Sequence, residues 1–176
     1  MFITPKNITS EFVQINNKVT TQKTGSLVIQ EKQNSGFIWA NNGYTVYMSS
    51  DGGNVYKRQF KVPVPLTSIS YLGNSKTFRR LFHRYEFLEL KILKSGTFLI
   101  FADGKIYRSV DSGKHFEIVH KLKHFGRGVG RGVMPSGIAE DIHGNVYYGE
   151  YFRNNNKEAA NIYRSVDDGK TWEVFY

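Results

Sequence analysis

The chain has 176 residues, of which 40% are hydrophobic and 15% aromatic, so it can build a full hydrophobic core and intrinsic disorder is not expected. It contains no cysteine, which excludes disulfides, thiolate metal sites and a cysteine nucleophile. A formal net charge of +9 favours anionic partners such as acidic sugars, phosphates or nucleic acid, unless the excess only keeps an aromatic-rich chain soluble.

No window approaches the roughly 18 apolar residues of a membrane-spanning helix, so no membrane association is expected. The first six residues lack the apolar core of a secretory signal, and a cytoplasmic location is expected if Met1 is the native start. The aromatic and β-branched residues and the 17 dispersed glycines favour strands joined by tight turns over helices. We therefore expect an all-β protein.

The first group of predicted strands covers roughly residues 25–62. Its four short runs are 27–31, 36–40, 45–49 and 55–60, with turn residues between them. The last two runs are joined through Ser49, Asp51 and Gly53. Serine and aspartate side chains hydrogen-bond the backbone of turns and glycine supplies a positive φ, so Asp51 is interpreted as a turn clamp and not as an acid catalyst.

The same order of four strands and one turn is predicted twice more along the chain. The second group covers roughly 86–120, with strands at 87–92, 97–101, 105–109 and 115–119. The third covers roughly 136–176, with strands at 137–141, 145–149, 161–165 and 171–176. The key turn residues of these two groups are Ser109, Asp111, Gly113, Ser165, Asp167, Gly169 and Trp172. Three copies in register predict three four-stranded antiparallel sheets, like the blades of a propeller.

The repeated turn resembles the Asp-box, or bacterial neuraminidase repeat, Ser-x-Asp-x-Gly-x-Thr-Trp, which residues 165–172 match throughout. The resemblance implies one partial β-propeller of about three four-stranded blades over residues 1–176, with the boxes on the face away from the ligand. Residues from about 80 to 176 are also similar to an uncharacterised bacterial branch of sialidase-like repeat proteins, through Gly149-Glu150-Tyr151-Phe152 and the last box. Members of that branch have further blades, which implies a truncated chain. The alternative is a protomer that closes its ring by self-association through open blade edges.

If the boxes mark one face, the ligand site is built from the other loops and from the links between blades. Glu150 and Tyr151 are the candidates for catalysis, because sialidase chemistry uses a tyrosine nucleophile assisted by a glutamate. The candidates for holding an anionic ligand are arginines, since guanidinium groups bind carboxylates bidentately: Arg80, Arg127, Arg131 and Arg153. The Phe/Tyr-Arg-Ile-Pro motif of sialidases is absent.

Each of these candidates has a structural alternative. Glu150 and Tyr151 can form a strand end with one side chain packed and the other exposed, because successive strand residues point to opposite faces. Arg127 and Arg131 can belong to a flexible glycine-rich link whose charges face water.

We expect a sialidase-superfamily propeller protein of unknown specificity that binds a glycan or another anionic ligand. The alternatives are a fragment of a sialidase-like glycoside hydrolase, or a truncated protein without autonomous activity. No cofactor is expected, and no metal, since the five histidines show no metal-ligand spacing with carboxylates. The arginine–glycine stretch at 126–132 is superficially similar to RNA-binding segments, but it is one short copy, and nucleic acid is not an expected partner.

Overall fold

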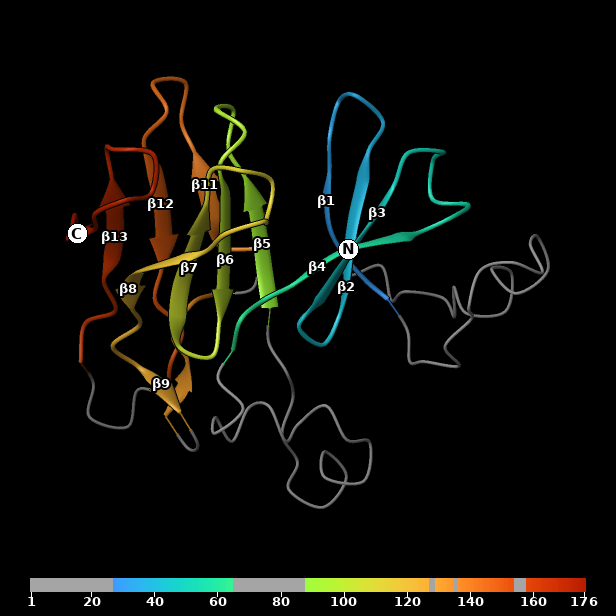
Figure 1. The fold of residues 1–176 in the computed structure, drawn as a ribbon. Helices are drawn as coiled ribbons and strands as arrows, with labels where there is room; N and C mark the ends of the chain where they lie inside the picture. Colours follow the sequence, from blue (N-terminus) through green and yellow to red (C-terminus); the bar gives the residue numbers. More distant parts are fainter. Residues whose placement is uncertain (1–26, 65–87, 127–128, 135, 154–157) are drawn as a thin grey trace, which may run out of the picture. The chain divides into compact units, whose positions relative to one another are not determined.

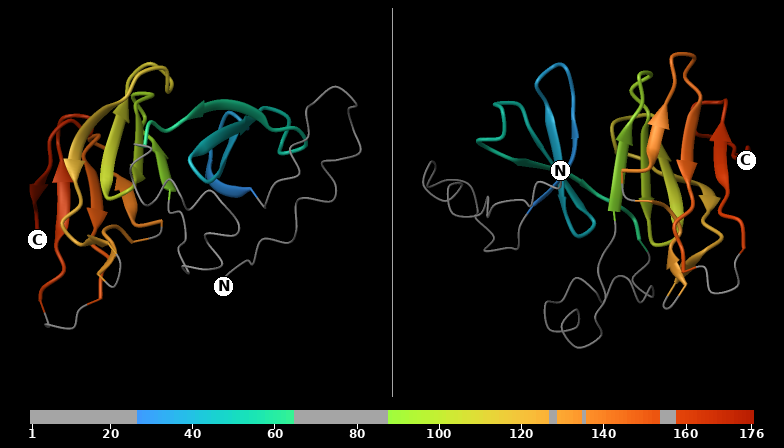
Figure 2. Two further views of the ribbon diagram at one scale, coloured as in Figure 1. Left: turned by 60° about the horizontal axis from the view of Figure 1, so that its bottom comes forward. Right: turned by 180° about the vertical axis from the view of Figure 1, so that it is seen from behind.

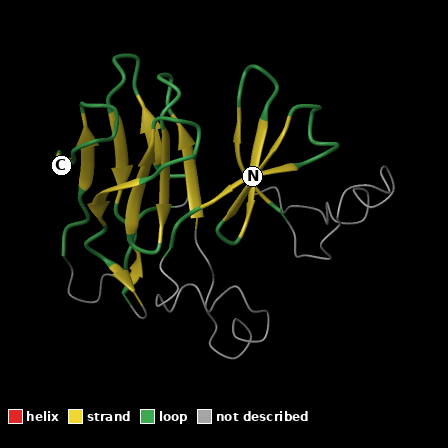
Figure 3. Ribbon diagram, viewed as in Figure 1, coloured by secondary structure: helices red, strands yellow, loops and turns green. Residues whose placement is uncertain are grey.

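The protein is described by a computed structural model, which covers residues 27–64, 88–126, 129–134, 136–153 and 158–176 (Figure 1). These residues form strands, turns and loops without any helix (Figure 3), so the described part contains no helix able to cross a membrane. The expected all-β fold with three antiparallel four-stranded sheets is confirmed. The chain divides into two compact units, Met1–Val62 and Pro63–Tyr176.

The first unit contains one sheet with its strands in chain order. The strands are β1 (Val28–Lys32), β2 (Ile38–Asn42), β3 (Thr45–Ser49) and β4 (Lys57–Lys61). The inner strand β2 is the most buried, as its apolar run Ile38-Trp39-Ala40 requires. The ladder between β3 and β4 shifts register between Val46 and Tyr47.

The second unit contains the two other sheets, also in chain order. The first of them has β5 (Leu88–Ile92), β6 (Phe98–Ala102), β7 (Lys105–Ser109) and β8 (Glu117–Lys121). A short hairpin of β9 (Phe125–Gly126) and β10 (Gly130–Arg131) follows. The second sheet has β11 (Ile138–Glu140), β12 (Val146–Gly149), β13 (Ile162–Ser165) and β14 (Glu173–Val174). Figure 2 shows the two sheets side by side from two directions.

The core of the second unit lies between these two sheets. Leu99, Phe101 and Ile106 of the β5–β8 sheet are fully buried against aromatic residues of the β11–β14 sheet. Tyr148 and Tyr163 stack with ring centroids 4.8 Å apart, and Phe101 meets Tyr148 edge-on at 5.4 Å. Each fully buried side chain of this size stabilises the fold by about 1.5–3 kcal/mol. The high aromatic content of the sequence therefore supplies the packing between sheets.

The three repeated turns, which we call the corners (49–53, 109–113 and 165–169), have the same hydrogen bonds. In each, the serine hydroxyl donates to the aspartate and accepts the N–H of the last glycine, at 2.9 Å in all three. The aspartate also accepts backbone N–H groups of the residues that follow, such as His115 at 2.9 Å and Thr171 at 2.8 Å. In the third corner, the Trp172 ring N–H donates to the Gly169 carbonyl at 3.1 Å.

These bonds explain why the last strand of each sheet begins two residues later than the sequence pattern predicts. The prediction placed strand starts at residues 55, 115 and 171, whereas β4, β8 and β14 begin at Lys57, Glu117 and Glu173. The N–H groups of Val55, His115 and Thr171 donate to the corner aspartates. A backbone donor used in this way is not available to a strand ladder, so pairing starts after it.

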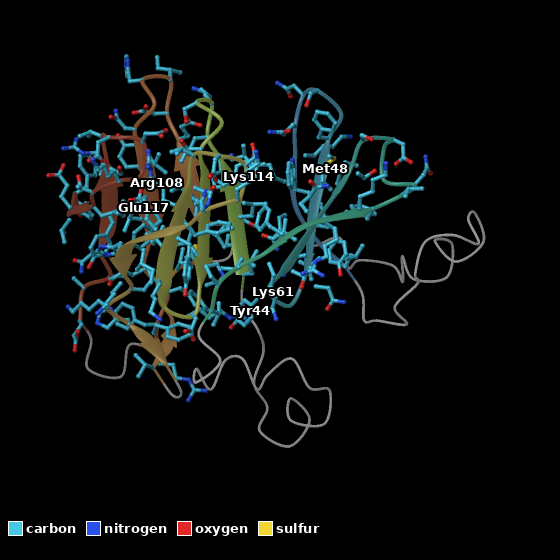
Figure 4. The ribbon with its side chains drawn as sticks, in the orientation of Figure 1. Tyr44, Met48, Lys61, Arg108, Lys114 and Glu117 are labelled. Carbon is cyan, nitrogen blue, oxygen red and sulfur yellow. The ribbon has the colours of Figure 1, made fainter. Side chains whose placement is uncertain are left out.

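Asp168, next to the aspartate of the third corner, joins the two sheets of the second unit. Its carboxylate accepts the hydroxyls of Ser95, at 2.6 Å, and of Thr97. Arg108 donates through Nη2 to the same carboxylate at 3.0 Å and through Nε to the Asp168 carbonyl at 2.9 Å. The remaining Nη1 of Arg108 donates to Glu117, and both residues are labelled in Figure 4. The third corner is thereby fastened to the face of the preceding sheet.

Candidate functional site

Strand direction separates the two ends of the β5–β8 and β11–β14 sheets. In each sheet the first and third strands run in the same direction, so the turn after the first strand and the corner after the third lie at one end. The hydrogen bonds of Asp168 to Ser95 and Thr97 bring these ends of the two sheets together. The described residues that follow β12 (150–153) and precede β13 (158–161), which we call the loop, and those between β8 and β11 (122–126, 129–134 and 136–137), which we call the link, lie at the opposite end. Figure 1 shows the β9 hairpin and the turn after β13 at opposite ends. Both candidate segments therefore lie together, away from the corners.

The link is bound to the end of β12 by backbone hydrogen bonds. Gly130 forms an antiparallel bridge with Phe152, and the N–H groups of Arg131 and Gly132 both donate to the Tyr151 carbonyl at 3.1 Å. The N–H of Arg153 donates to the Val129 carbonyl. A Cβ on Gly130 would lie 2.5 Å from the Cα of Phe152, so the close approach of the two chains requires glycine there. The glycine-rich link is thus a paired strand in its second half.

The alternation of this pairing places three of the predicted residues on one face. The bridge between Gly130 and Phe152 puts Arg131 directly opposite Tyr151. Arg153 follows Tyr151 by two positions, so its side chain lies on the same side of the strand. All three side chains are exposed. We call Arg131, Tyr151 and Arg153 the arginine–tyrosine face.

Glu150 is directed the other way and is buried. Its carboxylate faces Nδ1 of His124 at 3.0 Å and accepts the backbone N–H and the side-chain amide of Asn161, at 2.9 and 3.0 Å. The His124 ring stacks on Phe152 with centroids 4.0 Å apart, and its Nε2 lies 3.5 Å from Glu158. Glu150 thereby connects the link, through His124, to the start of β13, through Asn161. The Glu150 carboxylate therefore fixes the position of the strand end that carries Tyr151.

A second carboxylate fixes the far end of the link. The backbone N–H of Ser136 donates to Glu89 at 2.7 Å. Burial raises the pKa of Glu89, whereas the Ser136 hydrogen bond and the positive charge of Arg131 act in the opposite direction. The described residues contain no group of three or more histidines and carboxylates that could hold a metal ion.

The predicted site residues are distributed as follows. Arg131, Tyr151 and Arg153 come together on one face, while Glu150 lies beneath it, so the glutamate and the tyrosine form a strand end with one side chain packed and the other exposed. Arg80 and Arg127 lie outside the described residues. The ten predicted turn residues, Trp172 included, all take part in the corners.

Sequence reasoning missed the roles of His124, Phe152 and Asn161. His124 is 26 positions from Glu150, and no local spacing signals their contact. His124 and Glu150 meet because the link and the loop lie at the same end of the sheets, which follows from the direction of the strands. The one available signal was that the link and the β12–β13 loop were both expected on the same face. No protein-family model matches the chain, and the search of curated proteins finds no match.

Proposed function

We propose that the chain is part of an Asp-box β-propeller of the sialidase superfamily, with its three sheets as successive blades. We propose further that it binds a glycan or another anionic ligand at the arginine–tyrosine face. The observation that carries this proposal is the pairing of the link with residues 151–153, which places two arginines beside one exposed tyrosine. The corners, with their shared hydrogen bonds, support the repeat assignment.

The chemistry of this face suits an acidic sugar. A guanidinium group donates two parallel hydrogen bonds to a carboxylate, and the backbone pairing brings Arg131 and Arg153 to diagonally opposite positions of two paired segments. The exposed ring of Tyr151 offers an apolar surface to the carbon-bound hydrogens of a sugar and a hydroxyl to its polar groups. The net charge of +9 adds a long-range attraction for anions.

Binding is favoured over hydrolysis because of where Glu150 lies. A glutamate that assists a tyrosine nucleophile must reach the tyrosine hydroxyl, directly or through one water. Glu150 instead interacts with His124 and Asn161 on the inner side of the strand. A sialidase-like glycoside hydrolase is the alternative, and turnover of a fluorogenic sialoside that is lost in both Glu150→Gln and Tyr151→Phe would favour it.

The test is calorimetric titration of the full chain with a sialylated oligosaccharide and with the same oligosaccharide lacking the sialic acid. We expect binding of the acidic sugar alone. Arg131→Ala and Arg153→Ala should each weaken it about tenfold, which corresponds to the loss of one charge-assisted hydrogen bond.

Lys114→Ala is the matched control, because it removes the same charge from an exposed position at the corner end. Its affinity should stay within about twofold of the parent, since a distant exposed charge acts only through the screened field. If Lys114→Ala lowers the affinity as much as the arginine variants do, the loss of affinity reflects only the net charge, and this would contradict the assignment of the site.

A further inference from the structure

Two strands of the second unit have the same four residues in a row. β7 contains Ile106-Tyr107-Arg108-Ser109 and β13 contains Ile162-Tyr163-Arg164-Ser165. In both sheets the arginine lies opposite a glutamate of the last strand, Arg108 opposite Glu117 and Arg164 opposite Glu173. Because alternate residues share a face, the isoleucine and the arginine lie on one side of each strand. The two sheets thus present equivalent faces.

On the β5–β8 sheet this face is covered by the next sheet. Ile106 is 0% exposed and belongs to the core between the two sheets. The Arg108 side chain is 14% exposed and binds both the carboxylate and the carbonyl of Asp168. The occupant of the face is therefore a four-stranded sheet that brings a carboxylate at its corner.

On the β11–β14 sheet the equivalent face is open. Ile162, at the position of Ile106, is 39% exposed, and the Arg164 side chain is 32% exposed. Arg164 donates through Nε and Nη2 to Glu173 and lies 4.7 Å above the exposed ring of Phe175. Glu173 thus positions the Arg164 guanidinium, as Glu117 positions that of Arg108 on the covered face.

We propose that this face of the β11–β14 sheet docks a further four-stranded sheet of the same repeat, through a corner carboxylate at the position equivalent to Asp168. The face carries the same isoleucine and arginine as the covered face of the β5–β8 sheet. On that covered face the arginine binds a second carboxylate, Asp168, in addition to the glutamate of its own sheet, so a corner carboxylate can approach Arg164 in the same way. The inference concerns a surface other than the arginine–tyrosine face and does not depend on ligand binding.

A second copy of this chain fits the face less well. The residue at the Asp168 position is Gly52 in the first corner and Ser112 in the second, and neither has a carboxylate. The Asp168 of a second copy is already bound to its own Arg108. The chain's net charge of +9 also opposes association of two copies.

The experiment extends the full chain after Tyr176 with a duplicate of residues 122–176, and measures amide hydrogen exchange in β13 and β14 of the original part. Docking should slow exchange in these strands about tenfold or more, the effect of one charge-assisted hydrogen bond. Asp168→Ala in the appended copy should restore the exchange rates of the unextended chain, while Lys170→Ala in the appended copy, a neighbouring exposed position, should not.

The variants are chosen so that the original sheets stay intact, since both changes lie in the appended part. Arg164→Ala in the original part provides the other half of a double-mutant cycle, and combining it with the appended Asp168→Ala should cost no more than either change alone. Unchanged exchange in β13 and β14 overturns the proposal, as does a slowing that survives both variants. A dimer of the unextended chain in sedimentation, lost in Arg164→Glu, would assign the face to a second copy and also overturn it.

Discussion

At the scale of single residues, the buried serine of each corner occupies a position that requires a hydroxyl group, which both donates and accepts a hydrogen bond. Ser49 is fully buried, donates to Asp51 at 2.6 Å and accepts the Gly53 N–H at 2.9 Å. Its neighbour Ser50 is exposed. Two adjacent serines of one corner therefore differ in whether the hydroxyl satisfies a backbone group.

This difference predicts that Ser49→Ala destabilises the protein by about 1–3 kcal/mol, since it leaves the Gly53 N–H without its acceptor. Ser50→Ala should change the free energy of unfolding by less than about 0.5 kcal/mol. Urea denaturation followed by tryptophan fluorescence measures both, and similar losses in the two variants would contradict the assigned role of the Ser49 hydroxyl.

The aspartates of the corners predict sensitivity to acid. The hydroxyl of Ser49 and the N–H of Val55 lower the pKa of Asp51 from its ordinary value of 3.8, and the N–H and ring of His115 lower that of Asp111. For Asp168, burial raises the pKa, but hydrogen bonds from Ser95 and Thr97 and the charge of Arg108 outweigh it and the pKa is lowered.

Because these pKa values are lower in the folded state, the stabilisation is complete above the ordinary value of 3.8 and is lost as the pH falls below it. We expect Asp168→Asn to unfold with a shallower dependence on pH between about pH 4 and pH 2 than the parent chain, because one proton-linked group is removed. Urea midpoints measured across this range test the prediction, and identical slopes would contradict it.

At the scale of elements, the third corner needs its glycine for contact as well as for conformation. Gly169 has a φ of +79°, and a Cβ there would lie 2.5 Å from Cδ2 of Leu99 in the facing sheet. Gly144, in the turn between β11 and β12, has a φ of +84° with nothing within 4 Å of a Cβ. The two glycines share the backbone requirement and differ in packing.

We therefore expect Gly144→Ala to cost about 1–2 kcal/mol, the strain of a left-handed alanine. Gly169→Ala should cost more, because Leu99 must also move within a close-packed core. Thermal unfolding of the two variants gives the comparison. Equal shifts in Tm would mean that the corner has room to move away from the facing sheet.

At the scale of the whole molecule, the excess of positive charge predicts how binding responds to salt. The charges are spread along the chain, and their common field attracts an anionic ligand from a distance. Raising the ionic strength from about 0.01 M to about 0.15 M shortens the range of this field from about 30 Å to about 8 Å. The affinity for a sialylated oligosaccharide should fall over this range, whereas any binding of a neutral oligosaccharide should stay constant. An affinity for the acidic sugar that is independent of salt would exclude an electrostatic contribution.

The sequence alone determined the elements of this protein, because strands and corners depend on short-range patterns. Three groups of four short strand-like runs, with serine, aspartate and glycine at fixed positions after the third run of each group, were sufficient to predict the three sheets and their order. The strand starts after the corners were misplaced, since the aspartates capture backbone donors that the pattern alone assigned to the strands. The start of β2 was also predicted two residues early, at residue 36, whereas the strand begins at Ile38.

Tertiary structure decided which residues meet. The pairing of His124 with Glu150, the placement of Arg131 beside Tyr151, and the attachment of Asp168 to Arg108 all join residues far apart in the chain. Such contacts depend on how the sheets pack and on which end each loop leaves. No local pattern encodes that geometry, because the free energy that selects it comes from burying one sheet against another.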